Sequence, residues 1–324
     1  MSEDALCADG YLVITVWEGT REGGAYESPS LMVGELDALG RIRRFDQYDL
    51  ERLEPARARY AELRPDPLRI PPNAATRIFD RWREAFEARD WPALEALCAP
   101  TFVYEDRRRM NLLAGDRDMF LANSRLLAGL PDLRIERSVL ATSGDRLALE
   151  RLLWTSDDSE VEVLQVVEVD AEGRFLALIG FDPDDRRAAS AELLARDPHN
   201  DAVKRAMNDH DLDRLRAVLP DDFVLNDRRR TGLGQLGRED YLTSLAALFA
   251  QAPDVIIETL YTVAAEKHGN LITVRMFGTL ADGGAFESFM LRLASFRGDQ
   301  IVGMELFEPE DLDAARARFE ALRS

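Results

Sequence analysis

The chain of 324 residues has only two cysteines, Cys7 and Cys98, and three histidines. Two thiols are too few for a disulfide framework or a zinc site, so we expect neither. Its longest apolar runs, such as residues 12–17, fall far short of the roughly 20 residues that a transmembrane helix needs. The first residues show neither the basic nor the apolar segment of a signal peptide. These absences predict a cytoplasmic protein without a membrane span.

Basic residues are outnumbered by acidic ones, 41 against 60, which gives a formal net charge of −19. A surface this acidic repels phosphate backbones, so we expect no nucleic-acid partner. The 46% of hydrophobic and 31% of charged residues are ordinary for globular proteins, and the length favours about two domains.

Several motifs of enzymes are missing from the sequence. It has no phosphate-binding loop, no dinucleotide fingerprint, no serine nucleophile elbow and no cluster of metal ligands. We therefore expect neither a cofactor nor a metal. His199, His210 and His268 fall in a junction, a polar turn and a hairpin turn, where a surface position is expected.

The chain does contain an internal duplication. A helical pattern followed by a strand pattern in residues 81–104 recurs in residues 204–225. The same four residues, Asp-Arg-Arg-Arg, follow each strand at 106–109 and 227–230, a spacing of 121 residues (227 − 106). Matched landmarks in one order indicate two copies of one structural unit.

A third, partial copy precedes the other two. Residues 23–28 (Gly-Gly-Ala-Tyr-Glu-Ser) match residues 283–288 (Gly-Gly-Ala-Phe-Glu-Ser). We interpret residues 1–64 as the back half of the unit, without its helical front half. A proline-rich stretch at 65–73 is predicted to be a stiff linker. Two complete units are predicted to follow it: residues 74–196 and residues 197–324.

Each complete unit is predicted to contain helices and one strand, another helix, an antiparallel meander and a terminal helix. The meander of the last unit is predicted to have strands at 255–265, 270–279, 285–296 and 300–307, separated by turn residues. Helices followed by an antiparallel meander indicate an α+β fold. A curved sheet wrapped around helices would enclose a conical pocket, a common place for small ligands.

Residues 227–230, 283–288 and 305–312 give the sequence its family resemblance. It resembles the nuclear transport factor 2-like superfamily, specifically its SnoaL-like branch, and looks like the tandem tails of actinobacterial signalling proteins. The resemblance implies tandem cone-shaped α+β barrels: two complete units plus the N-terminal half unit. It leaves two functions open, because this superfamily hosts both binders and enzymes. One is small-molecule binding or regulation, with an apolar ligand; the other is a cofactor-independent hydrolase, isomerase or dehydratase.

The half unit supplies apolar strands without the helices that would cover them in a complete unit. Soluble proteins avoid exposed sheet edges and apolar faces of this kind. We expect the half unit to dock on a neighbouring cone or on the same segment of a second copy, which would give a homodimer through sheet faces.

Asp106 and Asp227 end the first strand of each unit, where the resemblance places a general base. A carboxylate that faces an apolar cavity has a raised pKa and can take up protons at neutral pH. The adjacent arginines favour the alternative, a turn aspartate held in an ion pair. Arg229 and Tyr241 are the candidates for stabilising negative charge in the last unit, although packing is the alternative role of Tyr241.

Glu287 and Glu305 lie in apolar strands that should be hairpin neighbours. Two such carboxylates can share a proton and act as an acid–base pair; alternatively they face solvent or a domain interface. The middle unit keeps Glu162 but has Ile179 at the second position. We therefore expect the middle unit to be degenerate and the last unit to hold the pocket. The predicted ligand contacts are Asp106, Glu162, Phe289 and Phe307.

Overall fold

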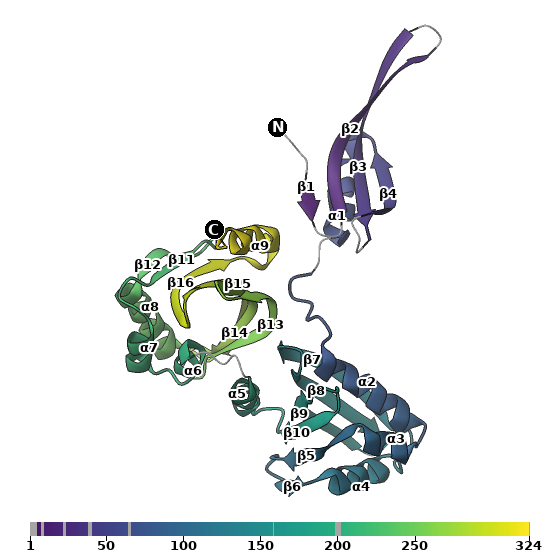
Figure 1. Cartoon of the computed structure of the whole chain (residues 1–324), viewed down its shortest axis with the longest axis vertical. Coiled ribbons are helices and arrows are strands. Elements are labelled where there is room, and N and C mark those ends of the chain that lie inside the picture. The colour runs from purple at the N-terminus through teal and green to yellow at the C-terminus, as the bar shows by residue number, and fades with distance from the viewer. Residues whose placement is uncertain are drawn as a thin grey trace. The chain divides into compact units, whose positions relative to one another are not determined.

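The computed structural model describes residues 5–7, 10–21, 24–37, 41–63, 66–157, 159–197 and 202–323. It divides into two compact units, residues 1–69 and 70–324. The first unit holds a four-stranded sheet and the second holds two six-stranded sheets. Helices pack on these curved sheets (Figure 1), so the predicted α+β fold is confirmed.

The first unit is an antiparallel sheet with the strand order β1-β2-β3-β4 and one α-helix. Its elements are β1 (Ala5–Cys7), β2 (Gly10–Arg21), β3 (Gly24–Leu36), β4 (Ile42–Tyr48), a 3-10 turn (Leu50–Arg52) and α1 (Leu53–Leu63). Sheet and helix share a core of Leu12, Leu31, Val33, Ala56 and Leu63. Helix α1 thus covers part of the face that the sequence suggested would be bare. Further along the same face of the hairpin, Ile14 and Val16 are 41% and 53% exposed.

The middle cone is the first half of the second unit. Its front half is α2 (Ala74–Glu87), α3 (Trp91–Ala96), β5 (Cys98–Asp106), β6 (Leu113–Gly115) and α4 (Arg117–Leu127). Its back half is β7 (Arg134–Ser143), β8 (Leu147–Ser156), β9 (Ser159–Val169), β10 (Phe175–Phe181) and α5 (Arg186–Arg196). The strand order is β6-β5-β10-β9-β8-β7, and β5 is parallel to β10. Asn73 begins α2 with a capping box to Thr76.

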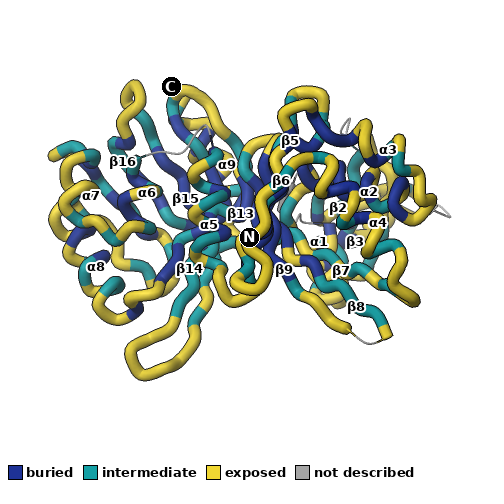
Figure 2. Tube along the Cα trace, turned by 90° about the horizontal axis from the view of Figure 1, so that it is seen from below, coloured by how far each residue is buried: buried dark blue, intermediate teal, exposed yellow. Residues whose placement is uncertain are grey.

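Each face of this sheet carries its own core. The inner face packs against α2 and α4, and its core includes Phe79, Phe120 and Leu152. The outer face packs against α5 through Leu149 and Leu193. The alternation of side chains along a strand sends neighbouring residues to opposite faces. Figure 2 shows long buried stretches on the strands and exposed loops between them.

The C-terminal cone repeats this arrangement. Its front half is α6 (Ala202–Asn208), α7 (Leu212–Val218), β11 (Val224–Asp227), β12 (Gly234–Gly237) and α8 (Arg238–Gln251). Its back half is β13 (Ile256–Glu266), β14 (Gly269–Thr279), β15 (Ala285–Arg297), β16 (Gln300–Phe307), a 3-10 turn (Pro309–Asp311) and α9 (Leu312–Ala321). The four predicted strands of the meander agree with β13–β16 to within one residue at each end. The predicted limits between the units stay predictions, since residues 64–65 and 198–201 lie outside the described chain.

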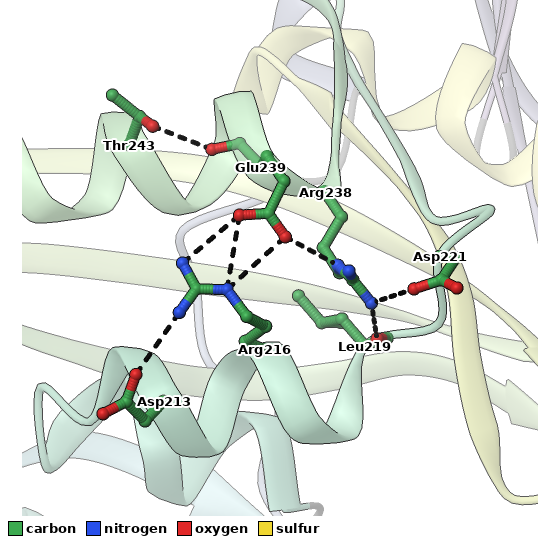
Figure 3. Close-up of polar contacts among 7 residues, drawn as sticks. All are labelled: Asp213, Arg216, Leu219, Asp221, Arg238, Glu239 and Thr243. Carbon is green, nitrogen blue, oxygen red and sulfur yellow. Dashed lines mark hydrogen bonds and ion pairs between the residues drawn. The ribbon is translucent and has the colours of Figure 1, made fainter.

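Equivalent helices are joined by an ion pair in both cones, but the acidic and basic residues have exchanged places. In the C-terminal cone Arg216 of α7 contacts Glu239 of α8, with 3.2 Å between Nη2 and Oε2. Figure 3 shows Glu239 between Arg216 and Arg238. In the middle cone Glu95 of α3 contacts Arg117 of α4 at 3.3 Å. The same pair of helices is therefore tied together in both cones, by opposite arrangements of charge.

Polar contacts join the two cones. The buried carboxylate of Glu258 on β13 accepts hydrogen bonds from Arg186 Nη2 and Ser190 Oγ of α5, both at 2.6 Å. Thr142 of β7 donates to the carbonyl of Leu260 on β13 at 3.4 Å. Among the helices that the structure describes, none is long and apolar enough to cross a membrane.

Candidate functional site

One row of residues crosses the inner face of the middle sheet. The strand register pairs Asp106 of β5 with Gly180 of β10, Gly180 with Gln165 of β9, and Gln165 with Glu150 of β8. Directly paired residues project to the same face of a sheet. The face is the inner one, because Leu152, two residues from Glu150, packs in the core with α2 and α4.

A cavity of about 310 Å³, here called the outer chamber, lies over this row. Its lining includes Asp106, Gly180 and Gln165 of the row, and Arg108 and Asn111 of the following turn. A second cavity of about 60 Å³, the inner chamber, shares six lining residues with it: Tyr104, Asn123, Leu127, Trp154, Gln165 and Leu178. The inner chamber is otherwise lined mainly by aromatic rings: Phe79, Trp82, Phe120 and Phe175.

Gly180 leaves the space that the outer chamber occupies. A Cβ atom at this position would lie 3.5 Å from Oδ1 of Asp106 and 3.4 Å from Cγ2 of Val163. The same row in the C-terminal cone reads Asp227, Leu306, Arg292 and Ile272. Larger side chains thus replace Gly180 and Gln165 there, and Arg292 is 5% exposed. The chambers lie in the middle cone, whereas the sequence led us to expect the pocket in the last unit.

Asp106 is a bound anion in the wall of the outer chamber. Arg108 donates to both of its oxygens, from Nε at 2.9 Å and Nη2 at 2.6 Å, and Asn111 donates at 2.7 Å. Burial alone would raise the pKa of Asp106, but these hydrogen bonds outweigh burial and hold the pKa below its usual value. A carboxylate with both oxygens occupied is a poor proton acceptor. The geometry favours the ion-paired turn aspartate over the general base.

Asp227 has the same surroundings in the C-terminal cone. Arg229 donates to its two oxygens at 2.8 and 2.7 Å, and the backbone N–H of Leu233 donates at 3.2 Å. Burial opposes ionisation, but the hydrogen bonds with Arg229 and Leu233 lower the pKa of Asp227 on balance. Arg229 was expected to stabilise negative charge in the last unit, but its guanidinium group donates hydrogen bonds to Asp227 instead.

Glu287 and Glu305 do not meet. The register of β15 and β16 places Leu293 opposite Glu305, whereas Glu287 lies opposite Phe277 on β14. Leu293 and Glu287 are six positions apart on β15, which is about 20 Å in a strand. Glu287 instead forms an ion pair with Arg275. The expectation that the two carboxylates share a proton is therefore wrong.

Glu305 holds the terminal helix on the outer face. Its Oε1 accepts a hydrogen bond from Nε of Arg318 on α9 at 2.7 Å. In the first unit Asp46 of β4 accepts from Nε of Arg59 on α1 at 2.9 Å. A carboxylate on the last strand thus anchors the terminal helix in both places, which is a structural role.

Two further predicted residues pack in cores. Tyr241 is buried with its ring 5.5 Å from that of Phe223, and its hydroxyl contacts Sδ of Met207 at 3.8 Å. Burial raises the pKa of Tyr241 to about 12, so the hydroxyl keeps its proton. Phe307 lies on the outer face in the core that contains Phe319 of α9. These contacts favour packing for Tyr241 and place Phe307 away from the inner face.

Glu162 and Phe289 lie on outer faces as well. Val161 and Val163 line the outer chamber, so Glu162 between them projects to the other side of β9. Phe289 is half-buried on β15, on the same face as Leu291, which packs in the core with α9. Of the predicted ligand contacts, Asp106 lines a chamber.

Sequence reasoning missed the polar residues deep in the middle cone. Gln165 and Glu150 each interrupt an apolar strand, at 163–167 and 147–153. Gln165 is the one polar residue of its stretch, whereas Glu150 is followed by the exposed Arg151. Alternation places Glu150 on the same face as Ala148 and Leu152, and a polar residue on an apolar strand face is the signal that could have identified both. Gly180 gave no signal, because a glycine in a strand has several explanations.

Glu150 is the most deeply buried charged residue of the row, with 0% exposure. Its Oε1 accepts a hydrogen bond from Arg137 of β7, which also donates to the carbonyl of Thr76 at 2.8 Å. Its Oε2 has no hydrogen-bond partner among the described residues. Burial raises the pKa of Glu150 to about 7, although Arg137 opposes the rise.

The described residues contain no group of three or more His, Cys, Asp or Glu side chains that could hold a metal ion. A search of curated proteins found no match.

Several solved structures align with 33–41% of the chain. IdmH from Streptomyces antibioticus, a proposed polyketide cyclase, is 18% identical, covering 41% of this chain and 99% of its own, with a TM-score of 0.30. A protein of Catenulispora acidiphila with a ketosteroid isomerase-like fold, in complex with trimethylamine, is 19% identical over 33% and 81%, with a TM-score of 0.29. BvnE pinacolase from Penicillium brevicompactum is 16% identical over 37% and 86%, with a TM-score of 0.31.

A family model gives the clearest relationship. The model of the SnoaL-like domain matches residues 79–177, a stretch that runs from α2 into β10. Residues 79–177 are thus a SnoaL-like domain.

Proposed function

We propose that the middle cone binds an apolar small molecule and that Asp106 is a structural anion rather than a general base. The observation that carries this proposal is the outer chamber, about 310 Å³, whose buried carboxylate, Asp106, is already bound by Arg108 and Asn111. Sites for small ligands measure about 300–1,000 Å³ and are mainly apolar with a few polar groups. The outer chamber reaches the lower limit of this size range, and the inner chamber adds an aromatic lining without a charged residue.

The other parts of the chain have a supporting or regulatory role in this proposal. The contacts of Glu258 with α5 join the C-terminal cone to the middle cone. Helices α5 and α9 cover the outer faces of the two cones. We propose that the first unit instead supplies the sheet face for a homodimer, and that the protein is cytoplasmic. Sedimentation can compare the oligomeric state of residues 74–324 with that of the whole chain. The same oligomeric state in both would exclude that dimer.

The alternative, a cofactor-independent hydrolase, isomerase or dehydratase, has one observation in its favour. Glu150 lies on the inner face with its pKa raised to about 7 by burial, close to the value that suits a general base. Its side chain is fully buried, however, and it is not among the residues that line the chambers. An enzyme of this kind would depend on Glu150 and would tolerate Asp106→Asn.

The binding proposal is tested by filling the outer chamber. Gly180→Leu introduces the residue that the C-terminal cone carries as Leu306, and should abolish binding of 2-isopropenylnaphthalene in equilibrium dialysis. Gly180→Ala should bind with intermediate affinity, since its Cβ atom makes ordinary contacts. Gly237→Leu is the matched control, because a Cβ atom there meets nothing within 4 Å.

Unchanged binding by Gly180→Leu, with the melting temperature of the wild type, would show that the outer chamber is not the site.

A further inference from the structure

One residue that lines the inner chamber has a buried polar atom without a partner in the described chain, and a second presents an amide that the fold leaves unused. Trp82 is 5% exposed, and its Nε1 has no hydrogen-bond partner among the described residues. Gln165 is 8% exposed and lines both chambers. Its side-chain amide forms no hydrogen bond with the parts of the chain that the structure describes. Leaving such groups unpaired is costly, so each is normally satisfied by protein, water or ligand.

Tyr104 adds a third group to the same chamber. Its hydroxyl oxygen accepts a hydrogen bond from Nδ2 of Asn123 at 3.1 Å. Burial raises the pKa of Tyr104, which keeps the hydroxyl protonated and able to donate. Tyr104 lines both chambers, as Gln165 does.

The chemistry of these groups defines what they can hold. An indole N–H donates only, a phenol hydroxyl donates its one proton, and a glutamine amide can donate or accept. They therefore fit an oxygen atom that accepts hydrogen bonds. None of the described residues that line the inner chamber is charged. An ion placed there would lose its hydration without gaining a partner of opposite charge.

We propose that the inner chamber selects ligands with an uncharged carbonyl or hydroxyl oxygen at one end. This inference rests on the proposed binding function. Trp82 and Gln165 recognise that oxygen, and Tyr104 completes the set of donors. The apolar body of the ligand lies in the outer chamber, where Trp154 borders both spaces. A carboxylate at the same end of the ligand is rejected.

Three probes of similar shape test this selectivity in the full-length protein. They are 2-acetylnaphthalene, which carries a carbonyl, 2-isopropenylnaphthalene, which has a methylene in place of the oxygen, and 2-naphthoate, an anion. Equilibrium dialysis should show the ketone binding about 3-fold to 10-fold more tightly than the hydrocarbon, as expected for one net hydrogen bond. The naphthoate should bind most weakly.

Two substitutions identify the residues responsible. Gln165→Leu and Trp82→Phe should each bring the ratio of ketone to hydrocarbon affinity towards one, mainly by weakening the ketone. The matched controls should keep the wild-type ratio: Gln235→Leu on exposed β12 and Trp91→Phe outside the chambers.

The outcomes separate this inference from the function on which it rests. Equal affinity of the wild type for ketone and hydrocarbon would overturn the selectivity and leave the binding function standing. Failure of the wild type to bind either probe would overturn both. If a variant does not fold, as judged by circular dichroism, the ratio measured for the wild type still decides.

Discussion

The two cones share a strand order and a turn sequence but differ in the row across the inner sheet face. Both end their first strand with Asp-Arg-Arg-Arg, and in both the aspartate binds the arginine two residues later. The middle row continues with Gly180, Gln165 and Glu150. The C-terminal row continues with Leu306, Arg292 and Ile272.

This difference separates what builds the cone from what makes a site in it. The Asp–Arg turn is present with and without the glycine that opens the outer chamber, so the turn belongs to the architecture. Beside the aspartate, the middle cone has Gly180 and Gln165 where the C-terminal cone has the larger Leu306 and Arg292, and the outer chamber lies over the smaller pair.

The largest expected effect tests whether the two turns are equivalent. Asp106→Asn and Asp227→Asn should each lower the free energy of unfolding by about 2–4 kcal/mol, because each leaves a half-buried arginine without its anion. Urea denaturation of both variants measures the effect. A clear loss in one variant alone would show that the two turns are not equivalent.

An effect of intermediate size is expected on the pH dependence of stability. It concerns Glu150, whose place in the row is taken by Ile272 in the C-terminal cone. The pKa of Glu150 is raised by burial from 4.5 to about 7, so the folded chain binds this proton more tightly than the unfolded chain. Its contribution to stability is complete below about pH 4.5 and is lost as the pH rises through about 7. Glu150→Gln should match the wild type near pH 4 and exceed it by about 1–3 kcal/mol near pH 8.

Chemical denaturation at several pH values measures that difference. Glu162→Gln is the control, because the hydrogen bond with Arg151 lowers the pKa of Glu162 and the sign of its pH dependence is opposite. Parallel pH profiles for wild type and Glu150→Gln would contradict the assignment of a raised pKa.

The smallest expected effect tests the exchanged ion pair. Glu95→Arg should destabilise the middle cone by about 0.2–1 kcal/mol, because it sets two arginines against each other at α3 and α4. The double variant Glu95→Arg with Arg117→Glu reproduces the charge order of the C-terminal cone and should restore the loss. A double-mutant cycle measured by thermal denaturation gives the coupling energy, and a coupling of zero would show that the pair is only a surface contact.

Much of the fold could be predicted because repeated motifs and the alternation of apolar and polar residues are visible in the sequence. The duplication, the strands β13–β16 and the α+β class follow from matched motifs, alternation and turn residues. The ion-paired state of Asp227 was one of two alternatives, since neighbouring arginines are visible in the sequence.

The site could not be predicted because it depends on register across strands. Glu287 and Glu305 are on adjacent strands, but their pairing is set by where β15 and β16 overlap, which spacing along the chain does not reveal. Gly180 lies beside Asp106 although 74 residues separate them (180 − 106). A one-residue shift would have turned a different side chain inward.

The exchanged ion pair also bears on how a chain with repeated cones finds its correct partners. Repeated domains in one chain can exchange equivalent segments while they fold, and such misassembly is a characteristic failure of multidomain proteins. If α3 of the middle cone packed with α8 of the C-terminal cone, Glu95 would meet Glu239; the reverse exchange would bring Arg216 to Arg117. Both mistakes place like charges together, so the reversal of charge penalises each wrong pairing and favours helices that come from the same cone.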